Sequence, residues 1–399
     1  MATTSSFSLS DCFQLSDTPR VEHPPAVIDL TPCRDSRVPV RIKNFTADVG
    51  VSESWDKQNI MFSKFKALPS YFGGKRKLVK YIFKPIKKTD GVFIDAFLGG
   101  GSVSLYAKAK GYKVISNDIA FRSVIIGQAL ISNNTVKLET EDLARLFIKQ
   151  KHDGFIRKNY CPKVFTSKIA DFLDNAVVAA RSIENETKRY LLLHLLIKFI
   201  LSCRQFGKFT HTRDTLDLEA RKWEWPLRSK SHAPKNLRMI QNPMMTLEKL
   251  KDEINHGIFD NHKENEVHQK DVFDFLKKVT GDVVYFDPPY PGSSAYEVEY
   301  GILDNILAGK KLDQKPSDFS NNDADEFLER MFESAKHIPQ WIISLGQNKE
   351  DVGVKPEKLL AMVQKHRKAE VIMLDHKWSV SNAGGRGQSD NIEYMIITL

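Results

Sequence analysis

The chain has 399 residues, 41% of them hydrophobic, which allows one large or two medium-sized domains with a proper core. Its net charge of +9 suits a polyanionic partner such as nucleic acid. The four cysteines are widely spaced without a CxxC pair, and no cluster of metal ligands is visible, so we expect neither a disulfide framework nor a metal site.

The first 62 residues are rich in Ser, Thr, Pro and Asp and show little periodicity, so we predict a disordered N-terminal tail. No basic-then-apolar leader opens the chain. The longest apolar stretch, residues 190–203, is too short to cross a bilayer and is interpreted as a buried helix. We therefore expect a cytoplasmic protein without a membrane partner.

A glycine-containing segment at residues 71–75 (Tyr-Phe-Gly-Gly-Lys) precedes a stretch with helical spacing of its apolar residues. Glycines let the backbone approach a ligand closely. A ligand carboxylate at the start of that helix would meet free N–H groups, the helix dipole and Lys75. The alternative is an ordinary basic first turn exposed to solvent.

A strand, a glycine turn and a helix follow in the order typical of nucleotide-binding folds. Residues 92–95 form the predicted strand, and Phe97 and Gly99 lie in the turn. Ser104 stands where the dinucleotide fingerprint has its third glycine, so a pyrophosphate ligand is not expected. The next strand, residues 112–116, ends before Asp118, an acid placed to hold a ribose diol or, alternatively, to cap a helix.

Residues 128–269 have a mainly helical and more basic pattern, in which His194 is interpreted as a buried histidine. Basic and aromatic residues alternate at 204–213, 221–225 and 228–232, a composition typical of nucleic-acid-binding surfaces. A solvated helical domain with ordinary tryptophan packing is the alternative. A strand over residues 266–273 is predicted to place Asp271 at its tip, where it could accept a hydrogen bond from an adenine amino group.

Asp287, Pro288, Pro289 and Tyr290 follow an apolar strand at residues 281–286. The prolines end the strand because they cannot donate to a sheet. One carboxylate, one proline carbonyl and one aromatic ring would then meet at the carboxyl edge of the sheet, as a holder for the exocyclic amine of a base. Taken alone, the tetrapeptide is also a common opening of a loop.

Beyond this motif, the polar residues 291–325 are expected to form a mobile lid or substrate loop. Three further strands are predicted at residues 341–345, 370–374 and 392–398. Between the last two, a loop with Arg386 could contact a phosphate or serve as an ordinary turn.

In their order, four motifs make the chain resemble the Dam-like family of DNA N6-adenine methyltransferases. They are residues 71–75, residues 93–102, Asn117-Asp118 and residues 287–290. The resemblance implies an α/β fold: a Rossmann-like, S-adenosyl-L-methionine-dependent methyltransferase sheet of seven strands, the last antiparallel, with helices on both faces and an inserted, mainly helical DNA-recognition domain. The implied domains are a tail at 1–62, a catalytic domain at 63–127 and 270–399, and a target-recognition insert at 128–269.

The resemblance also implies roles for individual residues. Asp287, Pro288 and Tyr290 would hold the target base, and the methyl donor, S-adenosyl-L-methionine, would be bound by Tyr71, Lys75, Phe97, Gly99, Asp118, Asp271 and Asp287. Double-stranded DNA is the expected partner and a monomer the expected state. The recognition sequence and the biological role, in restriction-modification, in a phage or in genome regulation, are not readable from these residues.

The chemistry of the motif agrees with this reading. An aromatic amine is a poor nucleophile, and accepting both of its hydrogens on Asp287 and the Pro288 carbonyl favours the pyramidal nitrogen of the transition state. A duplex hides that amine, so the base must leave the stack. Methylation of RNA adenine or of cytosine N4, or a non-catalytic DNA-binding protein on the same fold, remain the alternatives.

Overall fold

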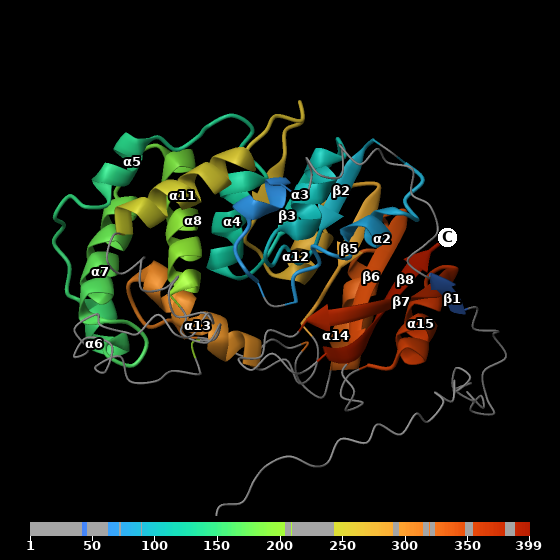
Figure 1. Cartoon of the computed structure of the whole chain (residues 1–399). Coiled ribbons are helices and arrows are strands. Elements are labelled where there is room, and N and C mark those ends of the chain that lie inside the picture. The colour runs from blue at the N-terminus through green and yellow to red at the C-terminus, as the bar shows by residue number, and fades with distance from the viewer. Residues whose placement is uncertain are drawn as a thin grey trace, which may run out of the picture. The chain divides into compact units, whose positions relative to one another are not determined.

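The computed structural model describes residues 42–45, 63–71, 73–88, 90–203, 209, 243–289, 295–313, 319, 324–347, 354–379 and 388–399. These residues form an α/β fold around one sheet (Figure 1). Phe72 and Tyr290, the loop with Arg386, and the basic segments at 210–232 lie outside the described residues.

Eight strands form the sheet in the order β1-β7-β8-β6-β5-β2-β3-β4. Every neighbouring pair is parallel except those that involve β8, which runs antiparallel between β6 and β7. The strands are β1 (Ile42–Phe45), β2 (Val92–Asp95), β3 (Lys113–Asn117), β4 (Glu266–His268), β5 (Val283–Phe286), β6 (Gln340–Gln347), β7 (Ala369–Ser379) and β8 (Gln388–Thr398).

The chain reverses its direction of progress across the sheet at β2. β3 pairs with one edge of β2 and β5 with the other, both in parallel. In open α/β sheets such a reversal leaves a crevice outside the carboxyl ends of the strands, where ligands bind. The carboxyl ends of β2, β3 and β5 therefore define where a site is expected.

Helices cover both faces of the sheet because successive residues of each buried strand point to opposite sides. Phe93, Val114 and Tyr285 pack in one core with α2 and α3, whereas Ile94, Ile115 and Val284 pack in the other with α12, α14 and α15. The helices of these two layers are α2 (Val79–Phe83), α3 (Ser102–Ala109), α12 (Val272–Leu276), α14 (Ala324–Ser334) and α15 (Pro356–Gln364).

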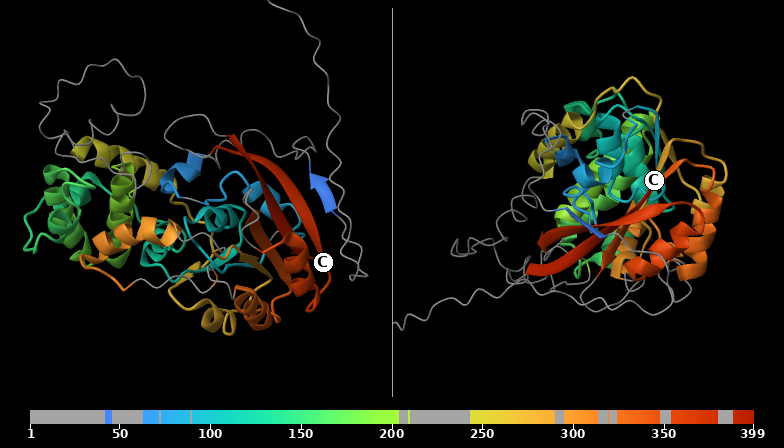
Figure 2. Two further views of the ribbon diagram at one scale, coloured as in Figure 1. Left: turned by 90° about the horizontal axis from the view of Figure 1, so that it is seen from below. Right: turned by 90° about the vertical axis from the view of Figure 1, so that its right-hand side faces the viewer.

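The remaining helices, α4 among them, lie together at one end of the sheet (Figures 1 and 2). Asn185 caps α8 by accepting a hydrogen bond from the Lys188 backbone N–H at 3.0 Å, and α8 is buried from Leu191 to Leu201. These helices are α4 (Phe121–Leu130), α5 (Thr140–Arg145), α6 (Phe155–Tyr160), α7 (Ser167–Arg181), α8 (Glu186–Ser202), α11 (Pro243–His256) and α13 (Ala295–Ala308), with the single-turn η1 (Phe65–Ala67) packed against α11.

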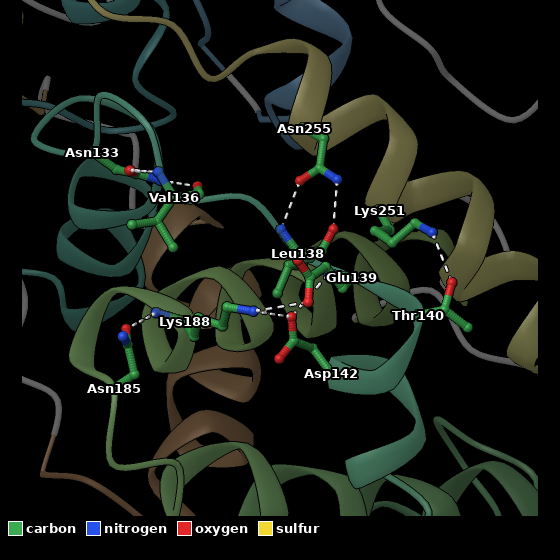
Figure 3. A network of polar contacts seen from close by, with 10 residues as sticks. All are labelled: Asn133, Val136, Leu138, Glu139, Thr140, Asp142, Asn185, Lys188, Lys251 and Asn255. Carbon is green, nitrogen blue, oxygen red and sulfur yellow. Dashed lines mark hydrogen bonds and ion pairs between the residues drawn. The ribbon is translucent and has the colours of Figure 1, made fainter.

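Polar contacts join the helices of residues 128–269, which we call the insert (Figure 3). Asn255 on α11 exchanges two hydrogen bonds with the backbone of Leu138, at 2.9 and 2.8 Å. Lys188 on α8 pairs with Asp142 on α5 at 2.7 Å. Such paired contacts fix α5, α8 and α11 relative to one another.

Several expectations need correction. Within the predicted tail, Ile42–Phe45 forms β1 and pairs with β7, so the sheet has eight strands rather than seven. The strand expected at 266–273 ends at His268, and a helix begins at Val272 because Asp271 caps it. β4 also lies inside the residues assigned to the insert, although it pairs with β3.

The segment expected as a lid contains the 14-residue helix α13, whose Tyr300, Leu303 and Ile306 are buried. Its buried apolar residues recur every three positions, a spacing that favours a helix over the expected loop. Among the described residues, no helix is both long and apolar enough to cross a membrane.

Candidate active site

The glycine turn after β2 is shaped by close contact with Tyr71. Gly99 and Gly101 have φ values of +52° and +78°, which favour glycine. A Cβ on Gly100 would lie 2.7 Å from the Tyr71 Cβ, so no larger residue fits there without a shift. Gly101 also caps α3, and the turn therefore brings bare backbone and a helix start to the carboxyl edge of the sheet.

Asp118 follows β3 and holds this turn in place. Its Oδ2 accepts a hydrogen bond from the Gly99 N–H at 2.8 Å, and its Oδ1 accepts one from the Ala120 N–H at 2.8 Å. α4 begins at Phe121, so Asp118 lies beyond the capping position that was its alternative interpretation. The next residue, Ile119, is 72% exposed, which places an apolar side chain in solvent beside the turn.

Lys75 brings two carboxylates together at this edge. Its Nζ lies 3.0 Å from Asp287 Oδ1 and 3.4 Å from Glu393 Oε1, and it donates a hydrogen bond to the Gly73 carbonyl at 3.2 Å. Burial alone would lower the pKa of Lys75, but the charges of Asp287 and Glu393 outweigh it and raise that pKa above its ordinary value. Lys75 is therefore an ammonium ion that joins the end of β5 to β8.

Asp95, the last residue of β2, is a buried carboxyl group in the same region. Its Oδ2 accepts a hydrogen bond from Ser104 Oγ at 2.6 Å, whereas its Oδ1 is buried without a hydrogen-bond partner among the described residues. Burial raises its pKa to about 7, the hydrogen bond from Ser104 opposes the rise, and the charges of Asp287 and Asp118 add to it.

A second cluster fastens α13 to the wall of the glycine turn. The Tyr71 ring stacks on the Tyr300 ring, with centroids 4.5 Å apart, and Arg122 Nε donates a hydrogen bond to the Tyr71 hydroxyl at 3.2 Å. Arg122 also forms an ion pair with Asp304 and lies over the Tyr300 ring at 4.8 Å. The residues on α13 thus close one side of the Tyr71 ring.

The other predicted residues are placed less centrally. Phe97 is partly buried, with its ring edge-to-face with Phe319 at 5.7 Å. Asp271 is exposed and uses its Oδ1 to cap α12, with the Phe273 N–H at 2.9 Å. Pro288 is buried directly after Asp287, and Tyr290 lies outside the described residues.

Three residues near this edge were given no role by the sequence reasoning: Asp95, Ile119 and Glu393. Asp95 and Ile119 could have been found, because each stands directly beside a motif at the end of a strand. Glu393 gives a weaker signal, a single acid inside an otherwise apolar strand. Its proximity to Lys75 depends on the pairing of β8 beside β6, which no local pattern predicts.

Comparison with known families decides what these features belong to. The model of the D12 class N6 adenine-specific DNA methyltransferases matches residues 71–213 and 228–347, about two thirds of the chain. The chain belongs to this family. The match begins at Tyr71 and spans the glycine turn, Asp118 and Asp287, so the site described above lies within it apart from Glu393.

Curated relatives of this methyltransferase agree. It is 26% identical to the Type II methyltransferase M2.HphI of Haemophilus parahaemolyticus over 82% of its own length and 96% of the relative's. It is 25% identical to the Type II methyltransferase M.CviAII of Paramecium bursaria Chlorella virus 1, over 77% and 91%. Against the modification methylase StsI of Streptococcus sanguinis the identity is 26%, but the match covers only 36% of that protein.

The family membership confirms the predicted DNA N6-adenine methyltransferase. The methyltransferase therefore acts on adenine in DNA. The family match does not support the alternatives, which were methylation of RNA adenine, methylation of cytosine N4 and a non-catalytic role. Within the described ranges, no group of three or more His, Cys, Asp or Glu side chains is arranged to hold a metal ion.

Proposed function

We propose that this enzyme transfers a methyl group from S-adenosyl-L-methionine to N6 of an adenine flipped out of double-stranded DNA at a specific site. The observation that supports this most directly is the position of Asp287. It lies at the end of β5, held by Lys75, next to the strand whose glycine turn is tied to Asp118. One edge thus offers an acceptor for an amine and a cradle for a nucleoside.

The residues present fit that methyl donor. Gly99 and Gly100 are half-buried in the turn, Asp118 would accept hydrogen bonds from a ribose diol, and exposed Ile119 would offer an apolar face to an adenine ring. The bound donor would supply an electrophilic methyl group on a sulfonium, which leaves without acid catalysis.

Asp287 and Pro288 would act on the target amine. Asp287 is within contact distance of an ammonium ion and is partly open to solvent, with a side chain 20% exposed. Its carboxylate and the Pro288 carbonyl can each accept one amine hydrogen, which keeps the nitrogen lone pair out of the ring. In-line positioning of that lone pair supplies much of the remaining rate enhancement. Tyr290 is proposed as the ring that stacks on the flipped base.

Recognition of the DNA is assigned to the insert. The Type II methyltransferases among the relatives support a site-specific activity. Stacking and pairing energy must be overcome to expose the target adenine, and basic residues on phosphates position the duplex while it opens. We propose that the enzyme acts as a monomer, since one chain contains a whole candidate site and methylation of one adenine needs only one site.

The experiment is methyl transfer from labelled S-adenosylmethionine to duplex DNA, followed by nucleoside analysis. We expect label in N6-methyladenine. Asp287→Ala should reduce transfer by at least about a thousandfold, because both the amine acceptor and the partner of Lys75 are lost. Asp274→Ala, an exposed acid on α12, is the matched control and should transfer at the wild-type rate. Label in RNA alone, or full activity of Asp287→Ala, would refute the proposal.

A further inference from the structure

Three protein oxygens surround the Lys75 ammonium. Its nitrogen donates a hydrogen bond to the Gly73 carbonyl at 3.2 Å and forms ion pairs with Asp287 Oδ1 at 3.0 Å and Glu393 Oε1 at 3.4 Å. The side chains of Lys75 and Glu393 are 6% and 4% exposed, whereas that of Asp287 is 20% exposed. We call Lys75, Asp287 and Glu393 the triad. Of its two carboxylates, Asp287 faces outward and Glu393 is closed off from any substrate.

We propose that Glu393 is a positioning residue for methyl transfer, which acts on the target amine through Lys75 and Asp287. From β8 it holds the inner side of the ammonium, so that Lys75 fixes Asp287 without neutralising it. This inference rests on the proposed role of Asp287 as the acceptor of the amine hydrogens.

The charges explain why a second carboxylate matters. Lys75 with Asp287 alone would form a neutral pair, in which the ammonium withdraws negative charge from the acceptor. With Glu393 ionised, the triad carries one net negative charge, and Asp287 becomes the stronger acceptor for amine N–H donors. Because Lys75 and Glu393 are buried, this coupling is screened less than it would be at the surface.

Stability does not account for Glu393. It lies opposite Gly346 on β6 and Leu374 on β7, in a strand whose next residues are buried or half-buried apolar side chains. An apolar residue there would avoid the cost of removing a carboxylate from water, and buried ion pairs are weak contributors to stability. Burial raises the pKa of Glu393, the charge of Lys75 opposes the rise, and that of Asp287 adds to it.

The test is Glu393→Gln in the full-length enzyme, which keeps the size of the side chain and one oxygen acceptor for Lys75 but removes the charge. We expect the single-turnover rate on duplex DNA to fall by about tenfold or more, since one charged partner in a low-dielectric site is worth at least that much. The Kd of S-adenosylmethionine, measured by calorimetry, should stay within about twofold, and the melting temperature should not fall. Glu393→Asp, which retains the charge, should recover part of the rate.

Two controls separate a positioning role from other roles. Glu357→Gln, on the first turn of α15 and exposed, should behave as the wild type. In a Lys75→Met background, Glu393→Gln should have little further effect on the rate, because the route through Lys75 is already gone.

Three results would overturn the proposal: a wild-type rate in Glu393→Gln, an effect that adds fully to Lys75→Met, or a weakened donor Kd with an unchanged single-turnover rate. The last would mean that Glu393 serves the donor instead. If Glu393→Gln does not fold, Glu393→Asp takes its place as the test. A folded Glu393→Asp enzyme without measurable methyl transfer also contradicts the proposal. Failure of the proposed function gives a different result: Asp287→Ala would then stay active, whichever residue stands at position 393.

Discussion

At the scale of single residues, Asp118 carries two tasks at once. Both of its carboxylate oxygens accept backbone N–H groups, one from the glycine turn and one from the approach to α4. A carboxylate oxygen has a second lone pair, so these contacts leave capacity for ribose hydroxyls. The shape of the glycine turn and the proposed contact with the donor ribose therefore depend on the same side chain.

Asp118→Asn should weaken donor binding more than it weakens the fold. The amide keeps one oxygen but turns an N–H group toward one of the two backbone donors, which disturbs the turn at Gly99 and removes a charged acceptor. We expect the Kd of S-adenosylmethionine to rise by about tenfold or more in calorimetry. Asp260→Asn, an exposed residue after α11, is the control. Unchanged donor affinity in Asp118→Asn would argue against ribose binding there.

At the scale of elements, α8 supports the segment that leads to Tyr71. His194 Nε2 donates to the Ala67 carbonyl at 2.9 Å, and Lys198 donates to the carbonyls of Lys66 and Leu68 while it pairs with Glu253 at 3.0 Å. Two side chains one helical turn apart thus satisfy three consecutive carbonyls. The buried polar residues of this apolar helix attach the insert to the segment that leads to Tyr71.

His194 makes the stability of the enzyme depend on acid. Burial lowers its pKa to about 3, so the folded protein keeps the ring neutral while the unfolded chain takes up a proton near pH 6.5. The free energy of unfolding is therefore independent of this group above about pH 6.5. It falls by up to about 1.4 kcal/mol per pH unit as the pH decreases from there toward 3.

Denaturant unfolding at pH 7 and pH 5 measures this dependence. Between these values the wild type should lose about 2 kcal/mol that His194→Gln does not lose, although the variant starts from a lower stability. His262→Gln is the control, because that ring is 89% exposed. Equal acid slopes in the wild type and His194→Gln would contradict a neutral buried ring.

The elements also show which parts of the fold local patterns can predict. Short apolar runs predict β2, β3 and β5, and the glycines themselves predict the turn, because each signal lies within about ten positions. β1 and the partnership of Glu393 with Lys75 could not be found in this way. Both depend on which distant strands become neighbours, and a charged side chain in a strand has no local mark of its partner.

The candidate site shows the same difference between local patterns, which predict its residues, and distant contacts, which they do not predict. Lys75 and Asp287 were expected at one site, and their ion pair brings them together. Lys75 was expected to face the donor carboxylate. It donates to the Gly73 carbonyl and forms ion pairs with Asp287 and Glu393, and its contact with the donor stays a prediction. Asp271 was expected at a strand tip because its neighbours Val272 and Phe273 look like strand residues; the acid instead starts a helix.

At the scale of the whole molecule, the net charge of +9 should govern the encounter with DNA. Each phosphate contact releases counterions, so the logarithm of the binding constant should fall linearly with the logarithm of the salt concentration. A slope steeper than about −3 is expected for an insert that makes several such contacts. Fluorescence anisotropy with a labelled duplex from 50 to 300 mM salt, roughly the range over which such contacts are screened, measures it. Binding that does not change with salt would exclude the insert as a phosphate-binding surface.

The position of β8 has a consequence for how the enzyme is made. β7 cannot reach β6 without β8, which is synthesised later and fills the place between them. On the ribosome, β2 to β6 can assemble in order, but β7 must wait and then dock together with β8 as a hairpin. Glu393 arrives at Lys75 only in this last step. A nascent chain would therefore form its glycine turn before Glu393 reaches Lys75 and Asp287. We expect methylation activity to appear only once the hairpin has left the exit tunnel.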